Sequence, residues 1–267
     1  MGEKFKGKTA WVSGGTKGIG EAAVRMFAEE GACVGFTARG AKDGEVFEQK
    51  LRAEGHNVRF FKCDVSVEED IRLSIEGTAE AFGGLSILVN NAGTIEVRPL
   101  HEYDTASWHH LMDTNVTSIF HAFKYAFPYL RKHEMSYVVN VGSISSYVGQ
   151  LETPVYTTSK GAVMQLSRSI GLDYAKYGVR SNCVCPGITD TPLLHLHLDT
   201  TPDPEGHLRE RLRRVPLGRV LTPEDVAKSI LYFSCEDSAG ITATNLIVDG
   251  GYLAAAEWDT EAQTVRR

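Results

Sequence analysis

Short apolar runs alternate with longer amphipathic stretches along most of the chain. Runs rich in β-branched and aromatic residues predict strands at Thr9–Ser13, Cys33–Thr37, Val58–Lys62, Ser86–Asn90, Tyr137–Val141, Val179–Cys185 and Asn245–Asp249. Between them, apolar residues at helical spacing predict helices at Glu21–Glu30, Glu45–Glu54, Glu68–Phe82, Thr105–Arg131, Val155–Tyr177 and Pro223–Cys235. This alternation predicts an α/β fold with a doubly wound, seven-stranded parallel sheet flanked by helices.

These elements fill the chain without a linker or a repeat, which predicts a single domain over residues 1–267. One segment, Thr189–Gly218, breaks the rhythm and is rich in Pro, His, Leu and Arg. We expect this segment, about residues 189–218, to form a small lid over a substrate.

Composition and charge restrict the class of protein. Hydrophobic residues make up 42% and charged residues 23% of the chain, a balance typical of a globular domain. The 28 Lys and Arg face 34 Asp and Glu, and the resulting net charge of −6 predicts no nucleic-acid partner. The N-terminal segment lacks the apolar run of a signal peptide, and Tyr137–Leu151, an uncharged stretch, is too short and polar to cross a bilayer. We expect a cytoplasmic protein without a membrane partner.

Neither the cysteines nor the histidines predict a metal site. The five cysteines lie mostly in apolar runs, which indicates reduced, buried thiols. Cys183 and Cys185 are the closest pair, and we expect them to point to opposite faces of their strand. His195, His197 and His207 lack a matching carboxylate or cysteine cluster.

A glycine-rich turn follows the first predicted strand. Gly14, Gly18 and Gly20 form the pattern G-x-x-x-G-x-G directly before a helix, a spacing that differs from the G-x-G-x-x-G dinucleotide fingerprint. Glycines here permit a tight turn and let phosphate oxygens approach the N–H groups at the helix N-terminus. The position of the turn in a doubly wound pattern favours a phosphate site over ordinary turn chemistry.

Polar residues after the third and fourth strands complete an expected adenosine site. Asp64 follows the third strand, where its carboxylate can accept a hydrogen bond from an adenine amino group. Asn90 ends the fourth strand, and the small residues after it let a flat ring lie against the sheet edge. Each of these residues alone is also a common turn former.

The end of the second strand bears on which nicotinamide dinucleotide is bound. An NAD site usually carries an acidic residue near this position for the ribose 2′-hydroxyl. Here Ala38 is uncharged, Arg39 follows it, and Lys17 lies in the glycine turn. Two cations suit a 2′-phosphate, which predicts NADP. NAD is the alternative if both are only solvated surface charges.

Tyr156 and Lys160 are candidates for acid–base chemistry. Their spacing of four residues puts them on one helix face. A free tyrosine has a pKa of about 10, and a nearby ammonium group favours its phenolate form. Ser143 follows the fifth strand, where its hydroxyl can hydrogen-bond a substrate carbonyl.

Together, these motifs resemble the short-chain dehydrogenase/reductase family from about Lys8 to Tyr252, with Pro186-Gly187 and Asp249-Gly250-Gly251 adding to the match. The resemblance implies a Rossmann fold, hydride transfer between nicotinamide and a carbonyl or alcohol, and assembly as a homotetramer or homodimer. It also implies roles for four residues. Tyr156 is the general acid/base, Lys160 lowers its pKa and holds the nicotinamide ribose, Ser143 orients the substrate, and Asn115 holds a water in a proton relay.

The expected cofactor contacts are Gly14, Lys17, Gly18, Ile19, Gly20, Arg39, Asp64, Val65, Asn90, Gly93, Tyr156, Lys160, Pro186, Gly187, Thr189 and Thr191. Thr189 stands where the family usually has Ile or Val. Because the residue at that position acts through its backbone in the family, we expect no loss of activity.

The expected substrate contacts are Glu96, Ser145, Gln150 and Glu152, with the His195–His197 stretch. Their polarity favours a small polar substrate, unless Glu96 and Glu152 only face solvent. The arginine-rich segment Glu205–Arg219 is either a lid helix with a solvated basic face or a site that captures an anionic substrate group.

The sequence therefore predicts an NADP-preferring oxidoreductase for a small polar carbonyl compound or secondary alcohol. An NAD-dependent sugar or polyol dehydrogenase, a dihydrodiol dehydrogenase and a 3-oxoacyl reductase are the alternatives. A non-catalytic dinucleotide sensor is disfavoured, because Asn115, Ser143, Tyr156 and Lys160 are all present.

Overall fold

The computed structural model describes residues 3–255 and has one sheet of seven strands, all parallel, in the order β3-β2-β1-β4-β5-β6-β7. The strands are β1 (Thr9–Val12), β2 (Cys33–Ala38), β3 (Val58–Lys62), β4 (Ile87–Asn90), β5 (Ser136–Val141), β6 (Val179–Pro186) and β7 (Asn245–Val248). The predicted α/β class and doubly wound parallel sheet are confirmed.

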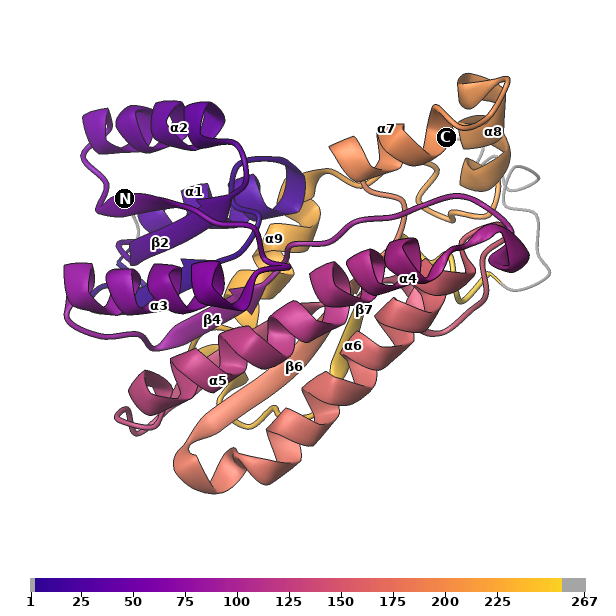
Figure 1. Ribbon diagram of the computed structural model, residues 1–267. Coiled ribbons are helices and arrows are strands. Elements are labelled where there is room, and N and C mark those ends of the chain that lie inside the picture. The colour runs from indigo at the N-terminus through magenta and orange to yellow at the C-terminus, as the bar shows by residue number, and fades with distance from the viewer. Residues whose placement is uncertain (1–2, 256–267) are drawn as a thin grey trace, which may run out of the picture.

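Helices cover both faces of this sheet (Figure 1). One face is covered by α1 (Gly18–Glu29), α2 (Ala41–Ala53) and α9 (Pro223–Tyr232). The other is covered by α3 (Glu68–Phe82), α5 (Ser118–Leu130) and α6 (Pro154–Asp173). Helix α4 (Thr105–Met112) leads into α5, and α7 (Pro192–Leu198) and α8 (Pro204–Leu212) lie at one end of the molecule (Figure 1).

The alternation of side chains along β1 explains why the sheet needs two helical layers. Ala10 and Val12 belong to the apolar cluster under α1 and α9, whereas Trp11 between them belongs to the cluster under α3 and α5. All four residues of the strand are buried. Successive side chains of a strand point to opposite faces, so a strand that is apolar throughout needs cover on both sides.

A turn of π-helix interrupts the helix predicted over Thr105–Arg131. The chain stays helical, but Asp113–Thr117 widens into π geometry between α4 and α5 and places Asn115 in the interior. A single π turn adds one residue to the local repeat, and this small change is not recognisable in the apolar pattern of one sequence. The helix predicted over Val155–Tyr177 is α-helical to Asp173 and then tightens into a 3₁₀ turn over Ala175–Tyr177.

The two cysteines of β6 share one face of their strand, and the expectation that they point apart was wrong. Residues i and i+2 of a strand point the same way, and the Sγ atoms of Cys183 and Cys185 lie 3.7 Å apart. They pack with Ile119 and Val163 between the sheet and α6. All five cysteines are free thiols. In residues 3–255, no group of three or more His, Cys, Asp or Glu is arranged to hold a metal ion, and no helix is long and apolar enough to span a membrane.

Strand order positions the functional site. The chain moves outward from β1 to β3 on one side, then returns to β4 beside β1 and continues the other way. The loops after β1 and β4 therefore diverge at the carboxyl edge of the sheet. Open α/β sheets bind their ligands in the crevice at such a reversal.

Candidate active site

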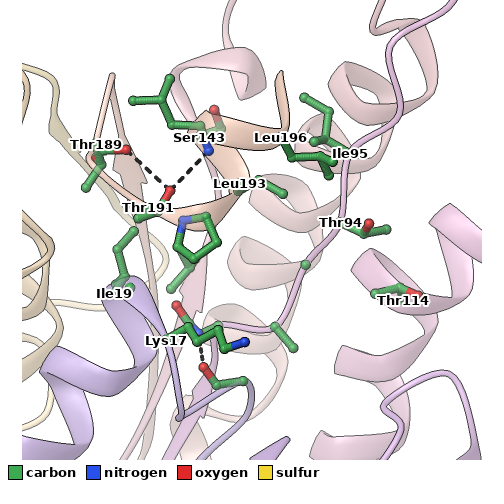
Figure 2. A pocket seen from close by; sticks show the side chains of 18 of the residues that line it. Lys17, Ile19, Thr94, Ile95, Thr114, Ser143, Thr189, Thr191, Leu193 and Leu196 are labelled. Atoms are coloured by element: carbon green, nitrogen blue, oxygen red, sulfur yellow. Dashed lines mark hydrogen bonds between the residues drawn. The ribbon is translucent and has the colours of Figure 1, made fainter. Parts of the chain in front are cut away.

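A cavity of about 580 Å³ lies at the carboxyl edge of the sheet. Its walls come from the glycine turn, the loops after β2 to β6, helix α6 and the two lid helices. Figure 2 shows part of this lining, including Lys17 of the glycine turn and Leu193 of α7. The lining holds fourteen of the sixteen expected cofactor contacts: Gly14, Lys17, Gly18, Ile19, Arg39, Asp64, Val65, Gly93, Tyr156, Lys160, Pro186, Gly187, Thr189 and Thr191. The cavity thus runs from the glycine turn to the candidate acid–base pair.

The glycine turn has the close approaches that the sequence predicted for a phosphate cradle. Gly14 and Gly18 have φ of +66° and +56°, where side chains are disfavoured. A Cβ on Gly20 would lie 2.1 Å from the Gly14 carbonyl oxygen, so the helix can start this close to the turn only with glycine. No side chain caps the N-terminus of α1, which leaves the N–H groups of its first turn available to an anion.

Asn91 supports this turn from the next strand along the sheet. Its Nδ2 donates to the carbonyl oxygens of Ser13 and Gly14 at 3.0 and 3.2 Å. Asn90 and Gly20 are outside the cavity lining. Asn90 is buried in the sheet and donates to Oδ1 of Asn140 at 2.8 Å. The sequence predicts Asn90 as the cofactor contact, but Asn91 is the residue that lines the cavity, because successive residues at a strand end point to opposite sides.

The end of the cavity next to β2 and β3 is lined by both basic and acidic side chains. Arg39 and Lys17 line it, and Lys17 forms an exposed ion pair with Asp43 at 3.1 Å. Burial acts to raise the pKa of Asp64, but hydrogen bonds from Ser66 and the charge of Arg39 outweigh it and lower that pKa. The sequence reasoning missed Asp43, which lies on α2 and carries no motif. This end fits an adenosine moiety, and Arg39 is its cation without an ion-pair partner among the described carboxylates.

The candidate acid–base pair lies at the other end, on α6. The side chains of Tyr156 and Lys160 are both buried, and the Lys160 Nζ is 5.8 Å from the centre of the Tyr156 ring. The Lys160 Nζ donates to the Val141 carbonyl oxygen at 2.8 Å, which ties the helix to the end of β5. Ser143 follows that strand and lines the cavity with both of them. The three residues predicted to act together are therefore brought to one place.

Burial dominates the proton affinities of this pair. It raises the pKa of Tyr156, while the Ser143 hydroxyl and the positive charge of Arg211 act to lower it. Burial lowers the pKa of Lys160 from 10.5 to about 8. Because a phenolate is disfavoured here, deprotonation of Tyr156 requires added positive charge in the cavity.

Asn115 lies behind the cavity wall rather than in its lining. Its Nδ2 donates to the Thr94 carbonyl oxygen at 3.0 Å and to the Ser159 Oγ at 2.9 Å, and its Oδ1 accepts from the Thr94 N–H. A Cβ on Gly93 would lie 3.4 Å from Asn115 Oδ1 and 3.5 Å from Lys160 Nζ. Both polar groups thus approach one glycine, which has no side chain to separate them.

The expected substrate contacts divide into two groups. Ser145 and Gln150 line the cavity, and Ser145 donates to Gln150, whose Nε2 lies 3.0 Å from Nδ1 of His197. Glu96 and Glu152 are outside the lining: Glu96 pairs with Arg98, and Glu152 is exposed at a positive φ of 56°. The inference of a polar substrate from these two carboxylates therefore loses its basis.

The wall at this end is mostly apolar. Ile95 and Leu193 belong to the apolar cluster that includes Tyr156, and Leu196 of α7 lines the cavity with them (Figure 2). Thr191 caps α7 by accepting from the Leu194 N–H, and its hydroxyl donates to the Thr189 carbonyl oxygen at 3.3 Å (Figure 2). The segment expected as a lid thus begins at the cavity and contributes two short helices to its wall.

Comparisons with known proteins agree with this arrangement. A family model described as enoyl-(acyl carrier protein) reductase matches residues 14–253. A cis-4-hydroxycyclohexanecarboxylate dehydrogenase of Sinomonas cyclohexanicum is 36% identical over 257 residues, which are 95% of this chain and 100% of that protein. An L-fucose dehydrogenase of Oryctolagus cuniculus is 35% identical over 251 residues, 94% of this chain and 86% of that protein. The ligand-free aldohexose dehydrogenase of Thermoplasma acidophilum superposes with a TM-score of 0.85 at 29% identity, covering 95% and 97% of the two chains.

The lowered pKa of Lys160 predicts a stability effect with a defined sign. Below pH 8 the lysine is charged in both states, and the folded protein bears the cost of burying it. Between about pH 8 and 10.5 only the unfolded chain keeps the proton, so stability relative to a neutral side chain rises with pH. We expect Lys160→Met to stabilise the cofactor-free protein at pH 7 by up to about 3 kcal/mol, less the lost bond to Val141.

Urea unfolding at pH 7, 8, 9 and 10 measures this difference. The gain should shrink as the pH rises, and Lys228→Met, at an exposed position of α9, should show neither the gain nor the trend. A Lys160→Met difference that is constant with pH would contradict the burial of a charged lysine.

Proposed function

Because the chain belongs to the short-chain dehydrogenase/reductase family, it is an NAD(P)-dependent oxidoreductase that acts on a CH–OH group, and we propose that it prefers NADP and interconverts a small secondary alcohol and its carbonyl compound. The observation that carries the proposal is the single cavity that joins the glycine turn to Tyr156, Lys160 and Ser143. A dinucleotide reaches from one to the other. The chain acts as one domain, with residues 189–218 as its lid.

Each of the four candidate catalytic residues has a task that its position allows. The bound nicotinamide supplies or accepts the hydride. Tyr156 transfers the hydroxyl proton of the substrate, and Ser143 donates a hydrogen bond to the substrate oxygen. Lys160 contributes positive charge that favours the phenolate of Tyr156, and Asn115 connects the buried lysine to solvent through a water.

Charge at the adenosine end supports NADP over NAD. Ala38 places no carboxylate against a 2′-phosphate, and Arg39 has no ion-pair partner among the described carboxylates. Asp43 weakens the contribution of Lys17 because the two are paired. Arg39 therefore carries most of the discrimination, and NAD is the alternative cofactor.

The substrate class can be identified by assaying a panel of candidate substrates. The named relatives act on a hydroxycyclohexanecarboxylate and on sugars. A panel of sugars, polyols, cyclic diols, 3-oxoacyl thioesters and hydroxycyclohexanecarboxylates, assayed by nicotinamide absorbance with NADP(H) and NAD(H), covers the sugar, dihydrodiol and acyl-reductase alternatives. A protein that binds the cofactor but converts none of them would be a dinucleotide sensor.

The proposal includes a small-molecule substrate, no nucleic-acid or membrane partner, and a cytoplasmic location. This location suits five free thiols.

The proposal also includes assembly as a homotetramer or homodimer. Helices α5 and α6 expose large apolar side chains, with Phe120 at 55% and Leu172 at 71% exposure. Such side chains on neighbouring helices suit contact with a second copy of the chain.

Removing the hydroxyl of Tyr156 tests the assigned acid–base role. We expect Tyr156→Phe to lower kcat by about 10²–10⁴-fold, because the variant lacks the hydroxyl proposed to move the proton. The cofactor Kd, measured by fluorescence titration, should stay near the wild-type value. Tyr129→Phe on α5 is the matched control. Wild-type turnover by Tyr156→Phe would remove this residue from its role.

Replacing Arg39 tests the cofactor choice. Arg39→Ala should reduce kcat/KM for NADP by about 10- to 100-fold, mainly through KM, and leave NAD unaffected. Arg52→Ala, at the far end of α2, controls for a general loss of positive charge. Ala38→Asp should shift preference towards NAD through repulsion of the phosphate. Equal or better kcat/KM with NAD in the wild type would contradict the NADP preference.

Light scattering tests the assembly. At micromolar concentration we expect a mass of two or four times 29.3 kDa. A monomer mass would overturn this part of the proposal without affecting the reaction. Phe120→Glu with Leu172→Glu should shift the mass towards the monomer.

A further inference from the structure

Arg211 is a partly buried cation that the assigned reaction does not use. It lies on lid helix α8 and lines the cavity together with Tyr156 and His197. Its Nη1 atom is buried without a hydrogen-bond partner. Among the described residues, the acidic groups whose charge acts on it are the hydroxyls of Tyr252 and Tyr156, and no carboxylate is one of them.

Burying a guanidinium without an anion is unfavourable. Each buried N–H that lacks a partner loses its hydration, and the charge loses more. Burial accordingly lowers the pKa of Arg211 from its ordinary value. A group this costly, in the wall of a ligand cavity, is explained most simply by a ligand that supplies the missing acceptor.

The surrounding groups do not neutralise this charge. Burial, with smaller effects from Arg211 and His207, lowers the pKa of His197 to about 4, so His197 is uncharged at pH 7. The other titratable neighbours are Tyr156 of α6 and Tyr252 near the C-terminal end of the described chain. The carboxylates that line the cavity, Asp43 and Asp64, belong to the adenosine end.

The cavity between Arg211 and the reacting groups has a mixed character that restricts the ligand. Ile95, Leu193 and Leu196 give it apolar walls (Figure 2). Ser145 and Gln150 are already hydrogen-bonded to one another, and Gln150 also contacts His197. Among the described residues, the end of the cavity near Tyr156 therefore offers an apolar surface and one cation, Arg211, with a buried N–H group that lacks a partner.

We propose that Arg211 binds a carboxylate of the substrate, so that the enzyme acts on hydroxy acids, or the corresponding keto acids, with an apolar body between the two groups. The carboxylate fits because a guanidinium binds its two oxygens side by side and because one cation balances one negative charge, whereas a phosphate carries close to two. This proposal rests on the proposed function, since the alcohol carbon must lie at Tyr156.

Binding of an unreactive probe separates this site from catalysis. Isothermal titration of the enzyme–NADP complex with cyclohexanecarboxylate and with the neutral cyclohexanecarboxamide compares two ligands of nearly equal shape. We expect the wild type to bind the carboxylate roughly 10- to 100-fold more tightly than the amide. Arg211→Met should remove that ratio, and Arg211→Lys should keep part of it, because it retains the charge but not the paired hydrogen bonds.

Arg209→Met is the matched control, since Arg209 lies on the same helix, is exposed, and pairs with Glu205. It should leave the ratio unchanged. Turnover of 4-hydroxycyclohexanecarboxylate against its carboxamide should show the same pattern in kcat/KM. Thermal unfolding of each variant confirms that it is folded.

The outcomes separate the two proposals. Equal binding of acid and amide by the wild type, or an unchanged ratio in Arg211→Met, overturns the carboxylate site even if alcohols are oxidised. A weaker NADP Kd in Arg211→Met with an unchanged ratio also overturns it and assigns Arg211 to the cofactor. Arg211-dependent binding of the carboxylate, without turnover of any alcohol or ketone, supports the site and contradicts the proposed function.

Discussion

Parallel strands impose the constraint on which the site depends. A strand can be followed by a parallel neighbour only if the chain crosses back over a face of the sheet, so every turn that leaves a strand emerges at the same edge. The glycine turn, the Asn90-Asn91 segment and Ser143 are far apart in the sequence, yet each directly follows a strand. Their convergence is a result of the connection rule rather than of contacts among them.

The same edge also brings charges into a poorly solvated space. Lys160 is held between α6 and the end of β5 by one carbonyl oxygen, that of Val141, and Arg211 enters from the lid without a described acceptor. Both cations are unfavourable for the fold by themselves. Their charges become favourable when an anionic or electron-rich group binds beside them. The site can then stabilise negative charge that develops during a reaction.

Features that depend on local periodicity were predictable, and those that depend on packing between distant segments were not. The strand at Val58–Lys62 and the helix at Glu68–Phe82 have the predicted bounds, because both patterns are strong and end at clear signals. The π turn around Asn115 is invisible to such a pattern. Glu96 is predicted to face the nicotinamide, but it lies outside the cavity lining and pairs with Arg98.

The charged residues of the lid show the same limit of prediction from the sequence. The arginine-rich segment predicts either a lid helix with a solvated basic face or a site that captures an anionic substrate group. Which of its arginines faces solvent and which lines the cavity depends on how α8 packs against α7, where Leu208 and Leu212 contact the apolar cluster that includes Leu194. Arg209 faces solvent and Arg211 faces the cavity, although they are only two residues apart.

The close approach of Gly18 and Thr191 couples the lid to the glycine turn. A Cβ at Gly18 would lie 3.0 Å from the Thr191 side chain, so the start of the lid packs directly on the glycine turn. The same lid carries Arg211 at the opposite end of the cavity. A displacement of the lid therefore changes the packing on the glycine turn and the position of Arg211 together.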